Sequence, residues 1–368
     1  MTGDSNNIML QVTKTFLPEF EKYVRLLERA WASGHITNYG NLARELEDAL
    51  KARLDVKHLF LVSSGTIGLQ LVIKAYGLNQ QVITTPFSYV ATTSSLVWEG
   101  CQPRFVDIRT DDLTIDADRI EAAITSQTQA ILAVHVYGFP CDVERLEAIA
   151  KARGLKLIFD AAHAFSVDYG DKSVLHYGDA SVLSFHATKL FHTVEGGAIV
   201  TNDDELAKKI DNMRHFGHKT QEEIWELGTN GKMSEMHAAM GLSVLPEVEA
   251  MIEQKKRTSL AYDELLKGSG LVFPGPRNGT KHNYAYYPII FPNEQALVAA
   301  KKELEVQGVF PRRYFYPALN KLQYVDYQPM PLAESIAERI LCLPLGHDVS
   351  EEDVLRISNI ITSSLETI

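Results

Sequence analysis

Short hydrophobic runs alternate with amphipathic stretches between residues 55 and 205. The runs at 155–160 and 180–185 are largely apolar, which is typical of strands that are buried on both faces of a sheet. The stretches between the runs carry apolar residues at helical spacing, and we expect helices at 67–76, 92–98, 117–124 and 143–153. This alternation predicts an α/β fold with a large, mainly parallel sheet covered by helices on both faces.

The chain on either side of this region has a different pattern. Amphipathic helices are expected before it, at 19–32 and 42–54, and a long helix after it, at 247–267. A predicted strand at 282–291 and a helix at 294–307 then follow. We therefore predict a large domain over residues 1–246, including the N-terminal helices, and a smaller C-terminal α+β domain over residues 247–368.

One lysine, Lys189, lies in the connection between two predicted buried strands, 180–185 and 198–201. A lysine amine in a desolvated site loses its proton more easily, so neutral amine becomes available to condense with a carbonyl group. Such a residue is typical of a Schiff-base lysine, and pyridoxal phosphate (PLP) is the commonest carbonyl cofactor that needs one. The alternative is a loop lysine in solvent.

A carboxylate ends the preceding hydrophobic run, at Asp160. PLP chemistry needs a carboxylate beside the pyridine nitrogen, because the negative charge keeps that nitrogen protonated and lets the ring act as an electron sink. An aspartate that only caps a helix or ends a strand is the alternative. In open α/β sheets ligands bind beyond the carboxyl ends of the strands, and Thr66, Tyr89, Asp160 and Lys189 all fall at such ends.

The turn Ser64-Gly65-Thr66 precedes a predicted helix, whose first amides can bind a phosphate. Plain helix capping is the alternative. Tyr89 follows the next predicted strand and can stack on a flat ring, although a core tyrosine would look the same.

Three segments together resemble the DegT/DnrJ/StrS family of PLP-dependent nucleotide-sugar aminotransferases: Asp160-Ala-Ala-His163, Ser184-Phe-His-Ala-Thr-Lys189 and Glu195-Gly-Gly197. The resemblance implies the aspartate aminotransferase fold (PLP fold type I). It also implies a homodimer with shared active sites, in which Asn230 reaches the cofactor phosphate of the partner subunit.

Further site residues follow from the resemblance. Lys189 would hold the cofactor, Asp160 would contact the ring nitrogen and His163 the ring hydroxyl, where many relatives carry glutamine. Gly65, Thr66 and Ser184 would bind the cofactor phosphate, and Tyr89 would stack on the ring. Arg313 and Tyr316 would contact the nucleotide-sugar, in a stretch that is otherwise interpreted as an exposed strand and turn. His186 is close in sequence, but no role is assigned to it.

The reaction implied by the resemblance has two halves. L-Glutamate would give its amino group to the cofactor, and a nucleotide-linked keto-sugar would then receive it. The segments 12–18, 85–93 and 185–192 are most similar to family members that aminate C4 of TDP-4-keto-6-deoxyglucose for surface polysaccharide (O-antigen) synthesis. Amination at C3 of a TDP-3-keto-6-deoxyhexose, a UDP-keto-sugar substrate, and a non-catalytic PLP-binding regulator are the alternatives.

The composition and net charge of the chain limit the classes of function and the compartments that we expect. The 368-residue chain has a formal net charge of −11, which argues against non-specific nucleic-acid binding. Its three cysteines are scattered and form no CxxC pair, as expected of reduced thiols in the cytoplasm. No signal peptide, membrane span or metal site is expected from the pattern.

Overall fold

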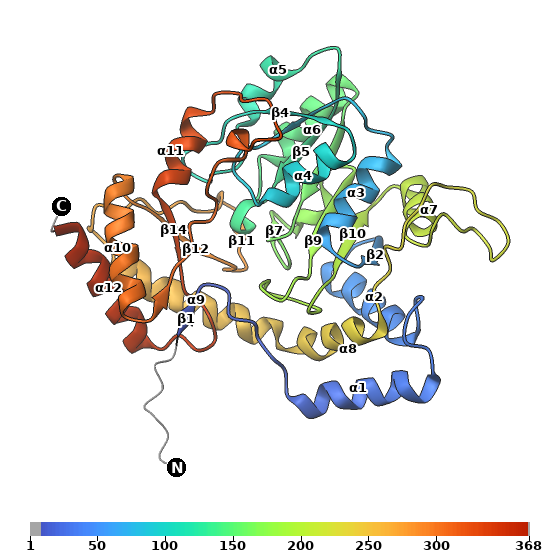
Figure 1. Cartoon of the computed structure of the whole chain (residues 1–368), viewed down its shortest axis with the longest axis horizontal. Helices are drawn as coiled ribbons and strands as arrows, with labels where there is room; N and C mark the ends of the chain where they lie inside the picture. Colours follow the sequence, from blue (N-terminus) through green and yellow to red (C-terminus); the bar gives the residue numbers. More distant parts are fainter. Residues whose placement is uncertain (1–8, 367–368) are drawn as a thin grey trace.

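A computed structural model describes residues 9–366, and its centre is a seven-stranded sheet in the order β2-β10-β9-β6-β5-β3-β4 (Figure 1). Every neighbouring pair is parallel except those of β10, which runs antiparallel to both β9 and β2. The mainly parallel α/β sheet predicted from the sequence is therefore confirmed. The strands are β2 (His58–Val62), β3 (Gln81–Thr84), β4 (Gln102–Phe105), β5 (Thr128–Val134), β6 (Lys156–Asp160), β9 (Ala180–Ser184) and β10 (Gly197–Thr201).

Helices cover both faces of this sheet, because successive strand residues point to opposite faces and both sets are apolar. In β5, Ile131 and Ala133 pack with α2, α6 and α8, whereas Ala130 and Leu132 pack with α3, α4 and α7. The helices of this part are α1 (Phe20–Ser33), α2 (Asn41–Leu54), α3 (Gly65–Ala75), α4 (Val90–Trp98), α5 (Ile120–Ala123), α6 (Val143–Arg153), α7 (Asp204–Met213) and α8 (Glu235–Val244).

A second hydrophobic core lies in the C-terminal part of the chain, where α10 and α12 pack together beside α9 and an antiparallel pair, β12 and β14. The elements are α9 (Val248–Leu265), β12 (Tyr287–Ile290), α10 (Glu294–Val306), β13 (Val309–Phe310), α11 (Pro331–Arg339), β14 (Ile340–Leu343) and α12 (Glu351–Glu366). A small separate sheet holds β7 (Asp168–Tyr169), β8 (Lys172–Ser173) and β11 (Thr280–Lys281).

The N-terminal strand β1 (Leu10–Gln11) pairs in parallel with β13, and Leu10 is buried in the second core. This short segment of the predicted large domain thus packs with the C-terminal elements. The domain division at residues 246 and 247 stays a prediction, and residues 1–8 and 367–368 of the two predicted domains lie outside the described residues. No helix within residues 9–366 has the length and apolar character needed to cross a bilayer.

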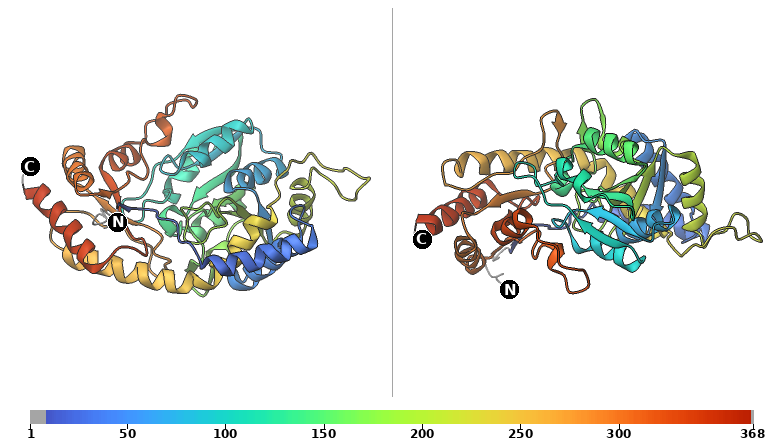
Figure 2. Two further views of the ribbon diagram at one scale, coloured as in Figure 1. Left: turned by 60° about the horizontal axis from the view of Figure 1, so that its bottom comes forward. Right: turned by 90° about the horizontal axis from the view of Figure 1, so that it is seen from above.

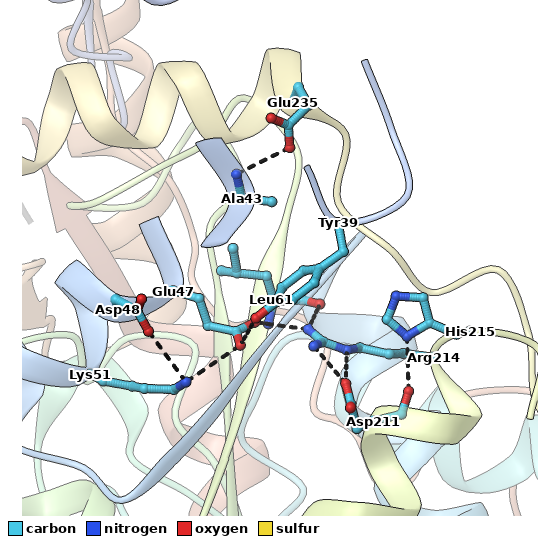
Figure 3. Close-up of polar contacts among 10 residues, drawn as sticks. All are labelled: Tyr39, Ala43, Glu47, Asp48, Lys51, Leu61, Asp211, Arg214, His215 and Glu235. Atoms are coloured by element: carbon cyan, nitrogen blue, oxygen red, sulfur yellow. Dashed lines mark hydrogen bonds and ion pairs between the residues drawn. The ribbon is translucent and has the colours of Figure 1, made fainter. Parts of the chain in front are cut away.

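A buried ionic network ties α2, β2 and α7 together (Figure 3). Glu47 of α2 accepts hydrogen bonds from the Leu61 amide at 3.0 Å and the Tyr39 hydroxyl at 2.6 Å. The Arg214 guanidinium donates to Glu47 at 2.9 Å and to Asp211 at 2.7 Å. Arg214 therefore fixes the point at which the chain leaves α7.

The segment that follows, 215–230, projects away from the body of the protein (Figure 2). Its apolar side chains Ile224, Trp225 and Leu227 are 65%, 61% and 74% exposed. Large apolar side chains grouped in this way are typical of a surface that another protein covers.

Candidate active site

The carboxyl ends of β2, β3, β6 and β9 meet at one edge of the sheet, and a pocket of about 320 Å³ lies there. Because β10 is antiparallel, its first residue, Gly197, lies at the same edge. The pocket is lined by most of the site residues predicted from the sequence: Gly65, Thr66, Tyr89, Asp160, His163, Ser184 and Lys189, with His186 beside them.

Helix α3 begins at the pocket wall. Its N-cap, Ser64, accepts a hydrogen bond from the Ile67 amide at 3.1 Å. The amides of Gly65 and Thr66 occupy the first two helical positions, where no intrahelical acceptor is available. A Cβ on Gly65 would stand 3.0 Å from the Ser184 Cβ, and one on Gly197 would stand 2.7 Å from the Gly65 nitrogen. The two glycines let α3 approach the strands closely, and the free amides make an anion site.

Asp160 lies buried at the end of β6. One carboxylate oxygen accepts from the Thr92 hydroxyl at 2.7 Å and the other from the Ala162 amide at 3.1 Å. The Thr92 hydroxyl also lies 2.7 Å from that of Ser88. Burial raises the pKa of Asp160, while these hydrogen bonds and the nearby charge of Lys189 act in the opposite direction. A cation placed against this carboxylate would be held firmly.

Lys189 lies in the loop between β9 and β10, and its Nζ is 3.5 Å from the Tyr286 hydroxyl. Burial lowers the pKa of Lys189 to about 8, although the charge of Asp160 raises it. Near neutral pH a fraction of this amine is therefore unprotonated and available as a nucleophile.

The geometry of His163 fixes its tautomer. Its Nδ1 accepts a hydrogen bond from the Tyr137 amide at 3.0 Å, so the proton of the neutral ring must be on Nε2. Burial lowers the pKa of His163 well below its usual value, which keeps the ring neutral. Tyr137 has a left-handed backbone with φ of 56°, and this orientation directs its amide at the histidine. His163 can thus serve as a neutral hydrogen-bond donor.

Two of the predicted substrate contacts are not found at the pocket within the described residues. Arg313 pairs with Glu294 at 2.7 Å and lies over the ring of Tyr316, and neither Arg313 nor Tyr316 lines the pocket. The adjacent Arg312 and Tyr314 line it instead. Asn230 lies at the end of the projecting segment, where its side chain accepts from Lys232 at 2.6 Å.

Several residues of the site were not predicted from the sequence. Thr92, which orients Asp160 but does not line the pocket, was interpreted only as a helix start. Its hydroxyl lies 2.7 Å from that of Ser88, which precedes helix α4. Tyr286 and Phe315 come from the C-terminal part. Asn283 fastens this part to the site by donating to the carbonyls of His163 and Phe165 at 2.8 and 2.9 Å. Because of these bonds and the left-handed backbone of Tyr284, the strand predicted at 282–291 begins only at Tyr287.

Known proteins resemble this chain over nearly its whole length. The model of the DegT/DnrJ/EryC1/StrS aminotransferase family matches residues 19–362. A dTDP-4-amino-4,6-dideoxy-D-glucose transaminase of Shigella dysenteriae is 42% identical, over 93% of this chain and 95% of the relative. One of the same name from Escherichia coli is 37% identical, over 98% and 100%.

The fold agrees with these relatives. The crystal structure of DesI in the presence of its TDP-sugar product superposes with a TM-score of 0.92 and 34% identity, covering 97% of this chain and 93% of that one. The structure, with its large mainly parallel sheet, is consistent with PLP fold type I, as the sequence predicted. The chain therefore belongs to the DegT/DnrJ/EryC1/StrS aminotransferase family.

Proposed function

We propose that this protein transfers the amino group of L-glutamate to C4 of TDP-4-keto-6-deoxy-D-glucose, giving TDP-4-amino-4,6-dideoxy-D-glucose and 2-oxoglutarate. The product would enter surface polysaccharide synthesis. The observation that carries the proposal is that Lys189, Asp160 and the free amides of α3 line one pocket. The choice of sugar is supported by the names of the two relatives above.

The pocket residues fit pyridoxal 5'-phosphate. The close approach that Gly65 and Gly197 permit leaves the first amides of α3 free for a phosphate, with Ser184 beside them. The buried carboxylate of Asp160 suits a protonated ring nitrogen, and Tyr89 lies on the wall, where an aromatic ring can stack. When bound, the cofactor would supply an electron sink for the bond that breaks at the amino-bearing carbon.

Each polar residue then has a separate task. Lys189 would hold the cofactor and, once an amino substrate displaces it, carry the proton between the substrate carbon and the cofactor. Asp160, oriented by Thr92, would keep the ring nitrogen protonated. His163 would donate its Nε2–H to the ring oxygen. Arg312, on the pocket wall, would bind anionic groups of the two substrates in turn.

We also propose a homodimer whose active sites are shared. The exposed apolar side chains of segment 215–230 support this proposal, because a partner subunit would cover them. Asn230, at the end of this segment, would then reach the cofactor phosphate of the other protomer. Thr66 lines both the active-site pocket and a surface groove that Leu227 also lines, so a partner in that groove would lie beside the cofactor site. We place the reaction in the cytoplasm, and the three free, buried cysteines are consistent with a reducing compartment.

A product assay tests the proposal. The protein is incubated with PLP, L-glutamate and either TDP-4-keto-6-deoxyglucose or its 3-keto isomer, and NMR identifies the aminated carbon. We expect an equatorial amine at C4. An amine at C3, or turnover of a UDP-keto-sugar alone, would refute the sugar assignment. Retained biological function in Lys189→Ala, with no visible absorbance of a lysine-bound cofactor, would favour a non-catalytic role.

A further inference from the structure

A second, smaller cavity adjoins the active-site pocket. Its volume is about 40 Å³, and we call it the Lys255 chamber. Lys189 belongs to the walls of both cavities, so the chamber lies against the same amine that the larger pocket exposes. The other shared wall residues are Ala162, His163, Ser184, Thr188 and Tyr286.

Three distant segments supply most of the remaining walls of the chamber. The N-terminal segment contributes Lys14 and Phe16, helix α9 contributes Gln254 and Lys255, and the loop after β14 contributes His347. The ring of Phe16 packs edge-on against that of His347, with 5.7 Å between their centroids. The chamber is therefore built where the two parts of the protein meet.

Besides Lys189, two lysines line the chamber, and only one of them has a counterion among the described residues. Lys14 is paired with Asp348 at 2.9 Å. Lys255 forms no ion pair with a carboxylate of residues 9–366, and its Nζ donates one hydrogen bond, to the Leu345 carbonyl at 3.3 Å. Burial lowers the pKa of Lys255 to about 8, with the charge of Asp348 acting in the opposite direction. An anion in the chamber would satisfy the remaining N–H donors and restore the charged form.

The size of the chamber limits what it can hold. A single buried water needs about 10–15 Å³ of such space, so the chamber admits a group of a few heavy atoms, about the size of a carboxylate. A hexose ring or a diphosphate requires more room, which the larger pocket provides.

L-Glutamate carries two carboxylates. Apart from Lys189, which would hold the cofactor, two cations without an ion pair line the two cavities in the described part of the chain: Arg312 and Lys255. We propose that Lys255 binds the side-chain carboxylate of the amino donor and thereby selects a dicarboxylic amino acid. The inference rests on the proposed aminotransferase function and adds to it the residue that recognises the donor.

The first test compares Lys255→Gln with Lys256→Gln, an exposed neighbour on the same helix. In the PLP-loaded protein, we expect Lys255→Gln to raise KM for L-glutamate about tenfold or more, because a charge-assisted hydrogen bond is lost. The KM for the keto-sugar should be unchanged, Lys255→Arg should recover part of the loss, and Lys256→Gln should resemble the wild type. Equal changes in both KM values, or none, would overturn the proposal.

The second test needs no turnover. In the cofactor-free protein labelled at lysine, glutarate should raise the pKa of the Lys255 amine measured by NMR, and its uncharged diamide, glutaramide, should not. Equal responses to the two compounds, or no response, would overturn the proposal. If the wild type fails to use L-glutamate while glutarate still shifts Lys255, the proposed function fails and the carboxylate site stands.

Discussion

The guanidinium of Arg214 lies 2.9 Å from the carboxylate of Glu47, and both side chains are 2% exposed. Both side chains also bond to the backbone of Leu61 in strand β2. The Leu61 amide donates to Glu47, and the Leu61 carbonyl accepts from Arg214. The pair thus joins helix α2 to strand β2 at the point where the projecting segment 215–230 begins.

Replacing Arg214 with methionine should destabilise the protein by about 3–5 kcal/mol, because Glu47 would lose its buried counterion and keep only the more distant Lys51, at 3.5 Å, as an ion-pair partner. Urea unfolding followed by circular dichroism measures the change. The matched control is Glu45→Gln, which removes an exposed pair with Arg29 and should cost no more than about 1 kcal/mol. A variant of Arg214 as stable as the control would show that the network does not hold these elements together.

Replacing Lys189 with methionine should stabilise the cofactor-free protein at pH 7. The pKa of Lys189 is about 8 in the folded protein and 10.5 ordinarily, so the unfolded chain binds more protons between these values. Wild-type stability therefore rises with pH through this window, and the advantage of Lys189→Met should shrink from pH 8 to pH 10.5. Melting temperatures across this range test the sign, with Lys256→Met as the exposed control. An advantage that grew with pH would contradict the lowered pKa.

Replacing Thr92 with valine should weaken PLP binding by roughly 10- to 150-fold, since a hydrogen bond to a charged group contributes about 1.5–3 kcal/mol. The variant keeps the shape of the side chain but removes the hydroxyl that orients Asp160. Titration of the apoprotein with PLP, followed by absorbance, gives the affinity. Thr92→Ser keeps the hydroxyl and should bind nearly as tightly as the wild type; equal losses in both variants would point to packing instead.

His163 should remain neutral, with its proton on Nε2, from pH 5.5 to pH 8. The amide of Tyr137 occupies Nδ1, and burial lowers the histidine pKa. Nitrogen-15 NMR distinguishes the two ring nitrogens directly, and a proton on Nδ1 would refute the assignment. His163→Gln, which can still donate, should keep more activity than His163→Met.

Arg312→Met should raise KM for both substrates, whereas Arg313→Met should leave both near wild type. The guanidinium of Arg312 lines the pocket, while that of Arg313 is held by Glu294 outside it. In the proposed function the two half-reactions would use the same pocket in succession, so one arginine could bind a carboxylate in the first and a diphosphate in the second. Steady-state kinetics with each substrate varied in turn separates the two variants, and a stronger effect from Arg313 would restore the assignment made from the sequence.

These two arginines also show where sequence reasoning ends. In extended backbone, successive side chains point in opposite directions, so a shift of one residue exchanges the pocket face for the outer face. The isolated β-bridge between Arg312 and Cys342 determines which of the two arginines faces the pocket. It joins segments about thirty residues apart that no local sequence pattern connects. Tyr286 is likewise far from Lys189 in sequence but contacts it.

Asp160 and Lys189 could be placed from the sequence because each adjoins a buried hydrophobic run. Once those runs were interpreted as parallel strands, the sheet itself predicted that their carboxyl ends share an edge. The antiparallel direction of β10 was not predicted, since a short apolar run does not reveal its orientation.

That direction has a consequence for the amine. Gly197 pairs with Ser184, so the loop that carries Lys189 leaves one strand and returns to its immediate neighbour. The entropy of closing this loop is lost when the sheet folds, before any ligand arrives. If Lys189 holds the cofactor as proposed, its amine, once released, would move only by rotation of its own side chain and would stay at a high effective concentration beside the cofactor.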